Sequence, residues 1–305
     1  VWRRCLDRGC ESRSWLLSAL IPKLARMTGS AVEQEYLFRE AIIEAVLRAA
    51  DLGSGSLSRT QLERFDFQGS TFRLVDAQGG IWNPTASRTA TWPRAGLVAT
   101  MSIATMLKSR YNDQELDDGV WRYDYQAGGT GGKNTKLRKA LELKLPVLWL
   151  KQISSLRYVP YKVFIVADDP QAQSCSISPD LDLYRQATTG TAIEKSYAIR
   201  ETKYRRHQRQ FRAEVLGAYQ CKCAICSLRH ESLLEAAHIT PDSDPSSTAE
   251  VSNGLSLCRI HHGAYDVNII GIDADYRVHV SESVLAEVDG PMLQHGIKDM
   301  QGRLL

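Results

Sequence analysis

The residues with the clearest chemistry are two pairs of metal ligands in the last third of the chain. Cys223 and Cys226 form a C-x-x-C pair, and Cys258 and His261 form a C-x-x-H pair. Together they offer the four thiolate and imidazole ligands of a tetrahedral zinc ion. The alternative, four ordinary buried side chains, would make this double spacing a coincidence. We therefore predict a structural zinc site, because four protein ligands leave the ion no open position for catalysis.

Three further polar residues stand between and directly after the zinc ligands. His238 ends the run Glu235-Ala-Ala-His, Asn253 begins Asn-Gly-Leu, and His262 follows the last zinc ligand. The segments that contain them, EAAHITP, NGLSLC and HHGAYD, resemble the HNH (ββα-metal) endonuclease family. The resemblance implies a two-stranded ribbon carrying His238, a loop carrying Asn253 and a helix presenting His262, with the zinc ion joining ribbon to helix.

This resemblance implies hydrolysis of phosphodiester bonds in DNA, leaving 5′-phosphate ends. An imidazole with an unperturbed pKa of about 6.5 suits a general base at cellular pH, and we assign that role to His238. In the family the motif asparagine braces the base, which implies the same role for Asn253. His262 and Asp266 are four residues apart, so on a helix they share one face and can hold Mg²⁺ or Mn²⁺. The alternative is a capping or core histidine beside a surface acid. Many family members carry another metal ligand directly before the base; this chain has Ala237, and we expect water in that position.

A basic segment precedes the metal ligands. Between residues 195 and 212 there are seven basic side chains against one acid, Glu201. Such a run is most often a solvated helix face, but a nearly single-signed run beside a nuclease motif favours contacts to DNA phosphates. We predict these contacts for Arg205, Arg206 and Arg209.

The N-terminal two-thirds carry a looser resemblance, over roughly residues 70–170, to SRA-type (SET- and RING-associated) domains. It rests on five segments: Gly80 to Pro84, Ser102 to Thr105, Tyr111 to Gly119, Trp121 to Tyr125, and Asn134 to Ala140. The resemblance implies a bent β-barrel that flips a modified cytosine into a pocket, where aromatic rings stack on it and an acid binds its edge. Matched to that pocket are Tyr111 and Asp113, followed by Tyr123 or Tyr125. The alternative is a polar hairpin with tyrosines that pack in the core.

An SRA-like reader followed by an HNH nuclease is similar to the modification-dependent restriction endonucleases of bacteria. This resemblance implies double-stranded DNA with 5-methylcytosine or 5-hydroxymethylcytosine as substrate and a cytoplasmic location. Because two antiparallel strands present phosphates related by a two-fold axis, we expect a homodimer. Two other functions stay open. One is a protein that binds modified DNA without cutting it, and the other is an HNH nuclease that ignores modification.

The helices and strands that must position these residues are mixed along the sequence, which predicts an α+β protein. Apolar residues at helical spacing predict a helix over residues 31–50, interrupted at Arg39 and Glu40, and Ser58 is expected to cap a short helix over 61–65. Four runs rich in β-branched and aromatic residues predict strands: 72–75, 120–125, 147–153 and 161–166. The polar stretch 168–194 is expected to connect the domains. The boundaries are an extension over 1–30, a reading domain over 31–190 and a nuclease domain over 191–305, whose last residues, 284–305, are expected to form a packed helix.

Composition excludes several classes of protein. A length of 305 residues favours two domains, and a net charge of +3 is too small to indicate a nucleic-acid partner without local clustering. No run approaches the roughly 20 apolar residues of a membrane helix. The glycine-rich segment AGGTGGKN, residues 127–134, lacks the first glycine and the Ser or Thr of a phosphate-binding P-loop, so we expect a surface loop. Four of the seven cysteines crowd among histidines, which favours metal binding in a reducing compartment.

Overall fold

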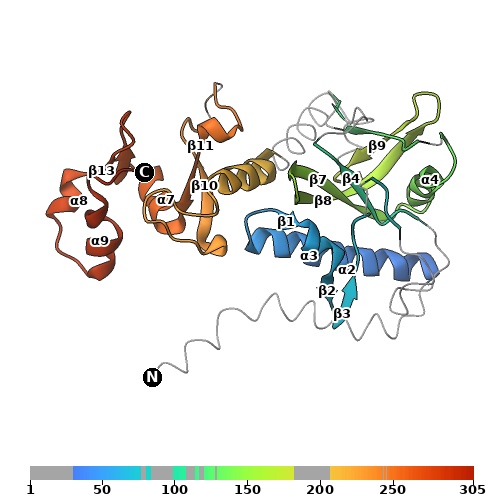
Figure 1. Ribbon diagram of the computed structural model, residues 1–305, viewed down its shortest axis with the longest axis horizontal. Helices are drawn as coiled ribbons and strands as arrows, with labels where there is room; N and C mark the ends of the chain where they lie inside the picture. Colours follow the sequence, from blue (N-terminus) through green and yellow to red (C-terminus); the bar gives the residue numbers. More distant parts are fainter. Residues whose placement is uncertain are drawn as a thin grey trace.

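The computed structural model describes residues 30–76, 80–83, 99–107, 114–116, 120–127, 129–181, 207–242, 244 and 246–305. In this part of the chain an N-terminal sheet, flanked by helices, is followed by a smaller unit of short strands and helices that holds the cysteine and histidine ligands (Figure 1). Helix and strand are mixed throughout, as the α+β expectation requires. None of the described helices combines the length and the apolar character needed to span a membrane.

The first helix, α2 (Ala31–Leu52), begins where Ser30 accepts a hydrogen bond from the backbone N–H of Glu33. This is the N-cap interaction that serine favours, and it confirms the helix expected over 31–50. Its apolar face enters the core through Ile42, Ile43, Val46 and Ala50, none of which is exposed.

Arg39, which interrupts the apolar pattern of α2, is completely buried. Its Nε lies 2.7 Å from Oε1 of Glu35, one turn earlier, and its guanidinium donates to the backbone carbonyls of Ala99, Thr100 and Pro146. Every partner of a buried charge offsets part of its desolvation cost. The side chain that breaks the pattern therefore joins α2 to two distant segments of the chain.

The N-terminal sheet has seven strands and runs in the order β4-β7-β8-β9-β6-β5, with β1 (Leu57–Ser58) paired to the first residues of β8. The strands are β4 (Ser102–Thr105), β5 (Gln114–Glu115), β6 (Trp121–Asp124), β7 (Pro146–Ser154), β8 (Arg157–Asp169) and β9 (Ser174–Ser178). All neighbours are antiparallel except β4 and β7. The expected strands over 120–125, 147–153 and 161–166 are confirmed by β6, β7 and β8.

Both faces of this sheet are covered, and successive residues of β7 show it. Val147 and Trp149 belong to one apolar cluster and Leu148 and Leu150 to the other, as alternation along a strand requires. The second cluster contains the buried face of α2, and the first contains Leu137 of α4 (Asn134–Glu142). A strand buried on both faces reads as a continuous apolar run, which is why β7 was recognisable from the sequence.

The expected bent β-barrel of SRA type is not seen in the described residues. Among the described strands, the path of hydrogen-bonded neighbours starts at β4 and ends at β5 without closing. Two local expectations are also corrected. Residues 72–75 are mostly outside a strand, because the hairpin is made by β2 (Phe65–Phe67) and β3 (Ser70–Phe72). The helix expected over 61–65 begins and ends two residues earlier, as α3 (Arg59–Glu63). The cap of that helix, Ser58, is confirmed as part of a capping box with Gln61.

The predicted connector over 168–194 contains a strand instead. Asp168 and Asp169 end β8, and Ser174–Ser178 form β9 between β8 and β6. Three of its five residues are serines, so its side chains carry little apolar signal, and its place in the sheet comes from backbone pairing on both sides.

The C-terminal unit begins with helical residues 207–218 and contains a two-stranded ribbon followed by a helix. Its elements are η1 (Glu231–Leu233), β10 (Leu234–His238), η2 (Val251–Asn253), β11 (Gly254–Cys258) and α7 (Arg259–Asp266), then β12 (Ile270–Ile272), β13 (Val278–Val280), α8 (Glu282–Ala286), α9 (Pro291–Gly296) and η3 (Lys298–Met300). The expected single helix over 284–305 is therefore three short helical segments. Gly290 and Pro291 separate the first two, since proline favours the start of a helix.

Candidate functional site

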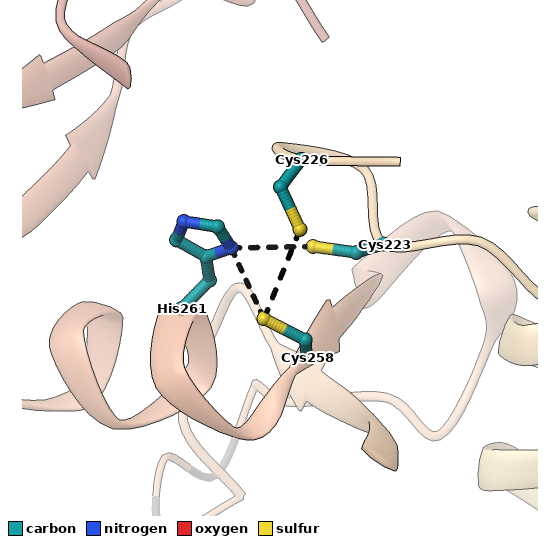
Figure 2. Close-up of side chains that lie close together, drawn as sticks. All are labelled: Cys223, Cys226, Cys258 and His261. Atoms are coloured by element: carbon teal, nitrogen blue, oxygen red, sulfur yellow. Dashed lines mark hydrogen bonds between the residues drawn. The ribbon is translucent and has the colours of Figure 1, made fainter. Parts of the chain in front are cut away.

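The two cysteine and histidine pairs come together at one point. Cys223 and Cys226 lie in the turn after residues 207–218, Cys258 ends β11, and His261 lies in the first turn of α7 (Figure 2). Their four ligand atoms all lie within 4.8 Å of one another. Nδ1 of His261 is 3.4 Å from Sγ of Cys223 and 3.2 Å from Sγ of Cys258, and the sulfurs of Cys226 and Cys258 are 3.9 Å apart. Metal–sulfur bonds of about 2.3 Å in a tetrahedron place sulfurs roughly 3.8 Å apart, so the cluster fits zinc.

The second nitrogen of His261 explains why Nδ1 faces the sulfurs. Nε2 lies 2.8 Å from the carbonyl oxygen of Gly296, at the end of α9. The carbonyl can only accept, so Nε2 carries the proton and Nδ1 presents its lone pair to the cluster. The hydrogen bond between the thiols of Cys258 and Cys223 lowers the pKa of Cys223 and raises the pKa of Cys258. This hydrogen bond therefore favours the thiolate form at Cys223 rather than at Cys258.

His238, the predicted base, is the last residue of β10, and its side chain is only 14% exposed. The ring of Phe211, from the helical residues 207–218, stacks on it with centroids 4.1 Å apart and planes 13° apart. Nε2 of His238 lies 4.0 Å from Oδ1 of Asp242. The imidazole is therefore confined on one face while its edge stays close to a carboxylate.

Asn253 stands at the junction of η2 and β11, beside the end of β10. Its side-chain oxygen accepts from the backbone N–H of Thr240 at 2.7 Å, and its side-chain nitrogen donates to the oxygens of Thr240, Ser247 and Thr248. Its own carbonyl accepts from the N–H of Ile239. Within the described residues, these bonds clamp the loop that starts directly after His238 and do not reach the ring, so the expected bracing is indirect.

Gly254, the next residue, has a steric role. A Cβ atom there would lie 2.3 Å from Cγ2 of Val215 and 3.0 Å from Cζ of Phe211. Such distances are far inside van der Waals contact, so only glycine lets the helical residues 207–218 approach the ribbon this closely. The glycine of the Asn-Gly-Leu segment thereby allows Phe211 to reach His238.

His262 lies on α7 between two carboxylates. Nε2 is 3.4 Å from Oδ2 of Asp266, one turn later, which places the two predicted metal ligands side by side. Nδ1 is 2.7 Å from Oε2 of Glu235 on β10. Sequence reasoning missed Glu235, although alternation along a strand would put residues 235 and 237 on the same face. Ala237 itself is fully buried, and its side chain has no atom that can coordinate a metal ion.

The predicted base pocket is only partly within the described residues. Tyr111 and Asp113 lie outside them. Tyr123 and Tyr125 are 3% and 4% exposed and belong to the core of the sheet, and the Tyr125 hydroxyl donates to Asp168. Burial raises the pKa of Tyr125. Neither ring offers a free face for a base to stack on, as the alternative of core-packing tyrosines predicted.

Of the three arginines predicted to contact the DNA backbone, only Arg209 lies within the described residues. Arg205 and Arg206 lie outside the described residues. Arg209 donates to the carbonyl of Pro160 and pairs with Asp51 at 3.1 Å, so its guanidinium joins the C-terminal unit to the end of α2 and to β8. The guanidinium of Arg209, which was expected to contact a DNA phosphate, is therefore paired within the protein.

A hollow of about 770 Å³ lies where the two parts of the molecule meet. Its wall combines side chains of α2, of the N-terminal sheet, of residues 207–218 and of β10, among them Asp51, Trp121, Tyr161, Arg209, Arg212 and Glu235. The hollow therefore reaches the strand that carries His238.

A comparison with known protein families agrees with the ribbon and helix. A family model described as HNH endonuclease matches residues 223–273. A solved structure described as a modification-dependent TagI restriction endonuclease is 18% identical over 76% of this chain and 83% of that chain, with a TM-score of 0.25. No curated protein sequence matches the chain. The family match coincides with the zinc ligands, His238, Asn253 and the His262–Asp266 pair, so residues 223–273 form an HNH endonuclease domain and the protein is an endonuclease.

Proposed function

We propose that this protein is a modification-dependent restriction endonuclease that cuts DNA by a one-metal HNH mechanism. The observation that carries the proposal is the arrangement of the HNH residues. His238 ends one ribbon strand, Asn253 precedes the other, and His262 and Asp266 lie together on the helix that the zinc cluster joins to the ribbon.

His238 is the general base in this proposal. A neutral imidazole takes a proton from the water that attacks the scissile phosphorus. Phe211 fixes the plane of the ring, and Asn253 fixes the loop that leaves it. Such restraint keeps the base in one geometry, and correct placement of a reacting group accounts for much of an enzymatic rate.

Nε2 of His262 and Oδ2 of Asp266 would hold the catalytic Mg²⁺ or Mn²⁺ ion, since they lie 3.4 Å apart and the carboxylate oxygen is the ligand type that such hard cations prefer. When bound, the ion would offset the negative charge that develops on the phosphate and on the leaving 3′ oxygen. The products would carry 5′-phosphate ends. The zinc cluster has no open position and keeps its structural role.

Recognition of 5-methylcytosine or 5-hydroxymethylcytosine is assigned to the N-terminal part. Support comes from its sequence resemblance to SRA-type domains, which places Tyr111 and Asp113 in the base pocket. The buried Tyr123 and Tyr125 would then support the wall of this pocket from the core rather than stack on the base themselves. Because each chain has one set of HNH residues, a homodimer would bring one set to each strand.

Cleavage of two plasmid preparations tests the proposal. The plasmids have the same sequence, one with 5-methylcytosine and one without, and each is incubated with the full chain and Mg²⁺ or Mn²⁺. The expected result is cutting of the methylated plasmid alone, abolished by His238→Ala. Equal cutting of both would leave an HNH nuclease that ignores modification. Selective binding in a gel-shift assay without metal-dependent cutting would leave a protein that only binds modified DNA.

A further inference from the structure

We propose that Glu235 is a positioning residue of the catalytic metal site: its carboxylate holds Nδ1–H of His262, so that Nε2 faces the cation beside Asp266. The inference rests on the proposed function, which makes His262 and Asp266 the ligands. It adds a residue from β10 to a site whose ligands both come from α7, and it gives that strand a part in metal binding although Ala237 cannot coordinate.

The geometry joins three side chains through one ring. Oε2 of Glu235 is 2.7 Å from Nδ1 of His262, and Oδ2 of Asp266 is 3.4 Å from Nε2 of the same ring. The two carboxylates approach opposite nitrogens, so they do not converge on one point. Glu235 therefore lies behind the histidine as seen from the metal site, and Asp266 lies beside it.

The chemistry of imidazole turns this arrangement into a function. A neutral ring carries one proton, and the nitrogen that donates to a carboxylate keeps it, which leaves a lone pair on the other nitrogen. A carboxylate behind a ligating histidine also increases the basicity of the ligand and fixes the orientation of its ring. Two ligand atoms that share an octahedral ion at about 2.1 Å lie roughly 3 Å apart. The 3.4 Å between Nε2 of His262 and Oδ2 of Asp266 is close to that separation.

Glu235 is itself held in place from α7. Nε of Arg259, one turn before His262, lies 3.4 Å from Oε1 of Glu235. The Arg259 side chain is 65% exposed, so this ion pair contributes little to stability. Its effect is orientation: with Oε1 directed to Arg259, Oε2 is the oxygen that faces His262.

Binding of Mn²⁺ to the zinc-loaded full chain, without DNA, tests the inference independently of activity. Electron paramagnetic resonance of free Mn²⁺ gives the affinity. The variants are Glu235→Gln, Glu235→Asp and Asp266→Asn, and Glu282→Gln on α8 is the matched control, since Glu282 is an exposed glutamate of the same domain. Zinc content and melting temperature verify that each variant is folded.

The expected result is a Mn²⁺ affinity about 10-fold lower in Glu235→Gln, the range found for residues behind a metal ligand. Glu235→Asp keeps the charge and is expected to retain part of the affinity, and Glu282→Gln all of it. If Asp266→Asn weakens Mn²⁺ binding but Glu235→Gln binds as the wild type does, the role of Glu235 is refuted and the metal site stands. If Asp266→Asn also binds like the wild type, the assigned metal site is wrong, and the inference falls with it.

Discussion

The ring of Phe211 stacks almost parallel on the imidazole of His238, with 4.1 Å between centroids. The helical residues that carry Phe211 are also attached to the N-terminal part. Arg209 pairs with Asp51, Arg212 donates to the carbonyl of Gly53, and Ala213 belongs to the apolar cluster of the sheet. His238, the proposed general base, is thus positioned by a helical segment that contacts both parts of the molecule.

Replacing Phe211 by leucine should therefore slow cleavage more than it weakens DNA binding. Leucine fills space but has no flat face, so the imidazole can tilt, and a misplaced catalytic group costs on the order of 10- to 100-fold in rate. The measurement is the single-turnover rate at saturating DNA together with the binding constant. Phe38→Leu, in the aromatic cluster of Phe67 and Phe72, is the control, and an equal rate loss in both variants would speak against positioning.

Replacing Gly254 by alanine should destabilise the nuclease domain. The added methyl group would meet Val215 and Phe211, and overpacking of this kind costs about 1–3 kcal/mol. Urea denaturation of the two variants Gly254→Ala and Gly271→Ala measures the effect. Gly271 lies on β12 with open space around it, so its alanine variant should unfold close to the wild-type midpoint. Equal midpoints for both variants would mean that residues 207–218 can move away from the ribbon at no cost.

Removing the zinc ligands should unfold the C-terminal unit and leave the N-terminal sheet intact. Zinc binding contributes on the order of 10 kcal/mol in small metal-stabilised folds. Cys226→Ser should lose one equivalent of zinc by native mass spectrometry, together with the ribbon amide signals in NMR spectra. Cys175→Ser is the control, because Cys175 lies in the sheet core and outside the cluster. A Cys226→Ser protein with unchanged ribbon signals would show that the fold does not depend on the ion.

Acid should weaken the β12–β13 hairpin through Asp273. The pKa of this carboxyl is lowered by its hydrogen bond to His279 and by the backbone N–H groups of Arg277 and Asp275. A lowered folded-state pKa stabilises the hairpin above the unfolded value of about 3.9, and this contribution disappears as the pH falls through the folded value. A ¹³C NMR titration should place the Asp273 midpoint below that of a model peptide, and His279→Ala should raise it. An unchanged midpoint in His279→Ala would exclude the histidine as the main cause.

The cluster of three cysteines and one histidine and the order of the HNH residues were predictable because each depends on short spacing along the chain. Glu235 was harder to find, since its partner, His262, lies on another element and the contact depends on how α7 packs over the ribbon. The burial of Tyr123 and Tyr125 also depends on residues that are distant in the sequence. Nothing in their immediate neighbours distinguishes a ring that lines a pocket from one that packs in a core.

In the N-terminal part, long apolar runs identified β7 and β8, while polar side chains concealed two features. Arg39 breaks the stripe of α2 because the acceptors that satisfy it come from residues 99, 100 and 146. Ser174 and Ser178 of β9 are buried, and the backbone of this strand pairs with β6 and β8. In both cases backbone groups of distant segments form the hydrogen bonds. The local pattern of polar and apolar residues cannot indicate such partners.

The hydrogen bond between His261 and the carbonyl of Gly296 matters for the design of fusions between this nuclease domain and another DNA-binding protein. The family match ends at residue 273, yet His261 of the cysteine and histidine cluster is hydrogen-bonded to α9, and His238 is stacked against Phe211 of residues 207–218. A fusion trimmed to the matched segment would lose both. A fusion that keeps both contacts must include at least residues 207–305.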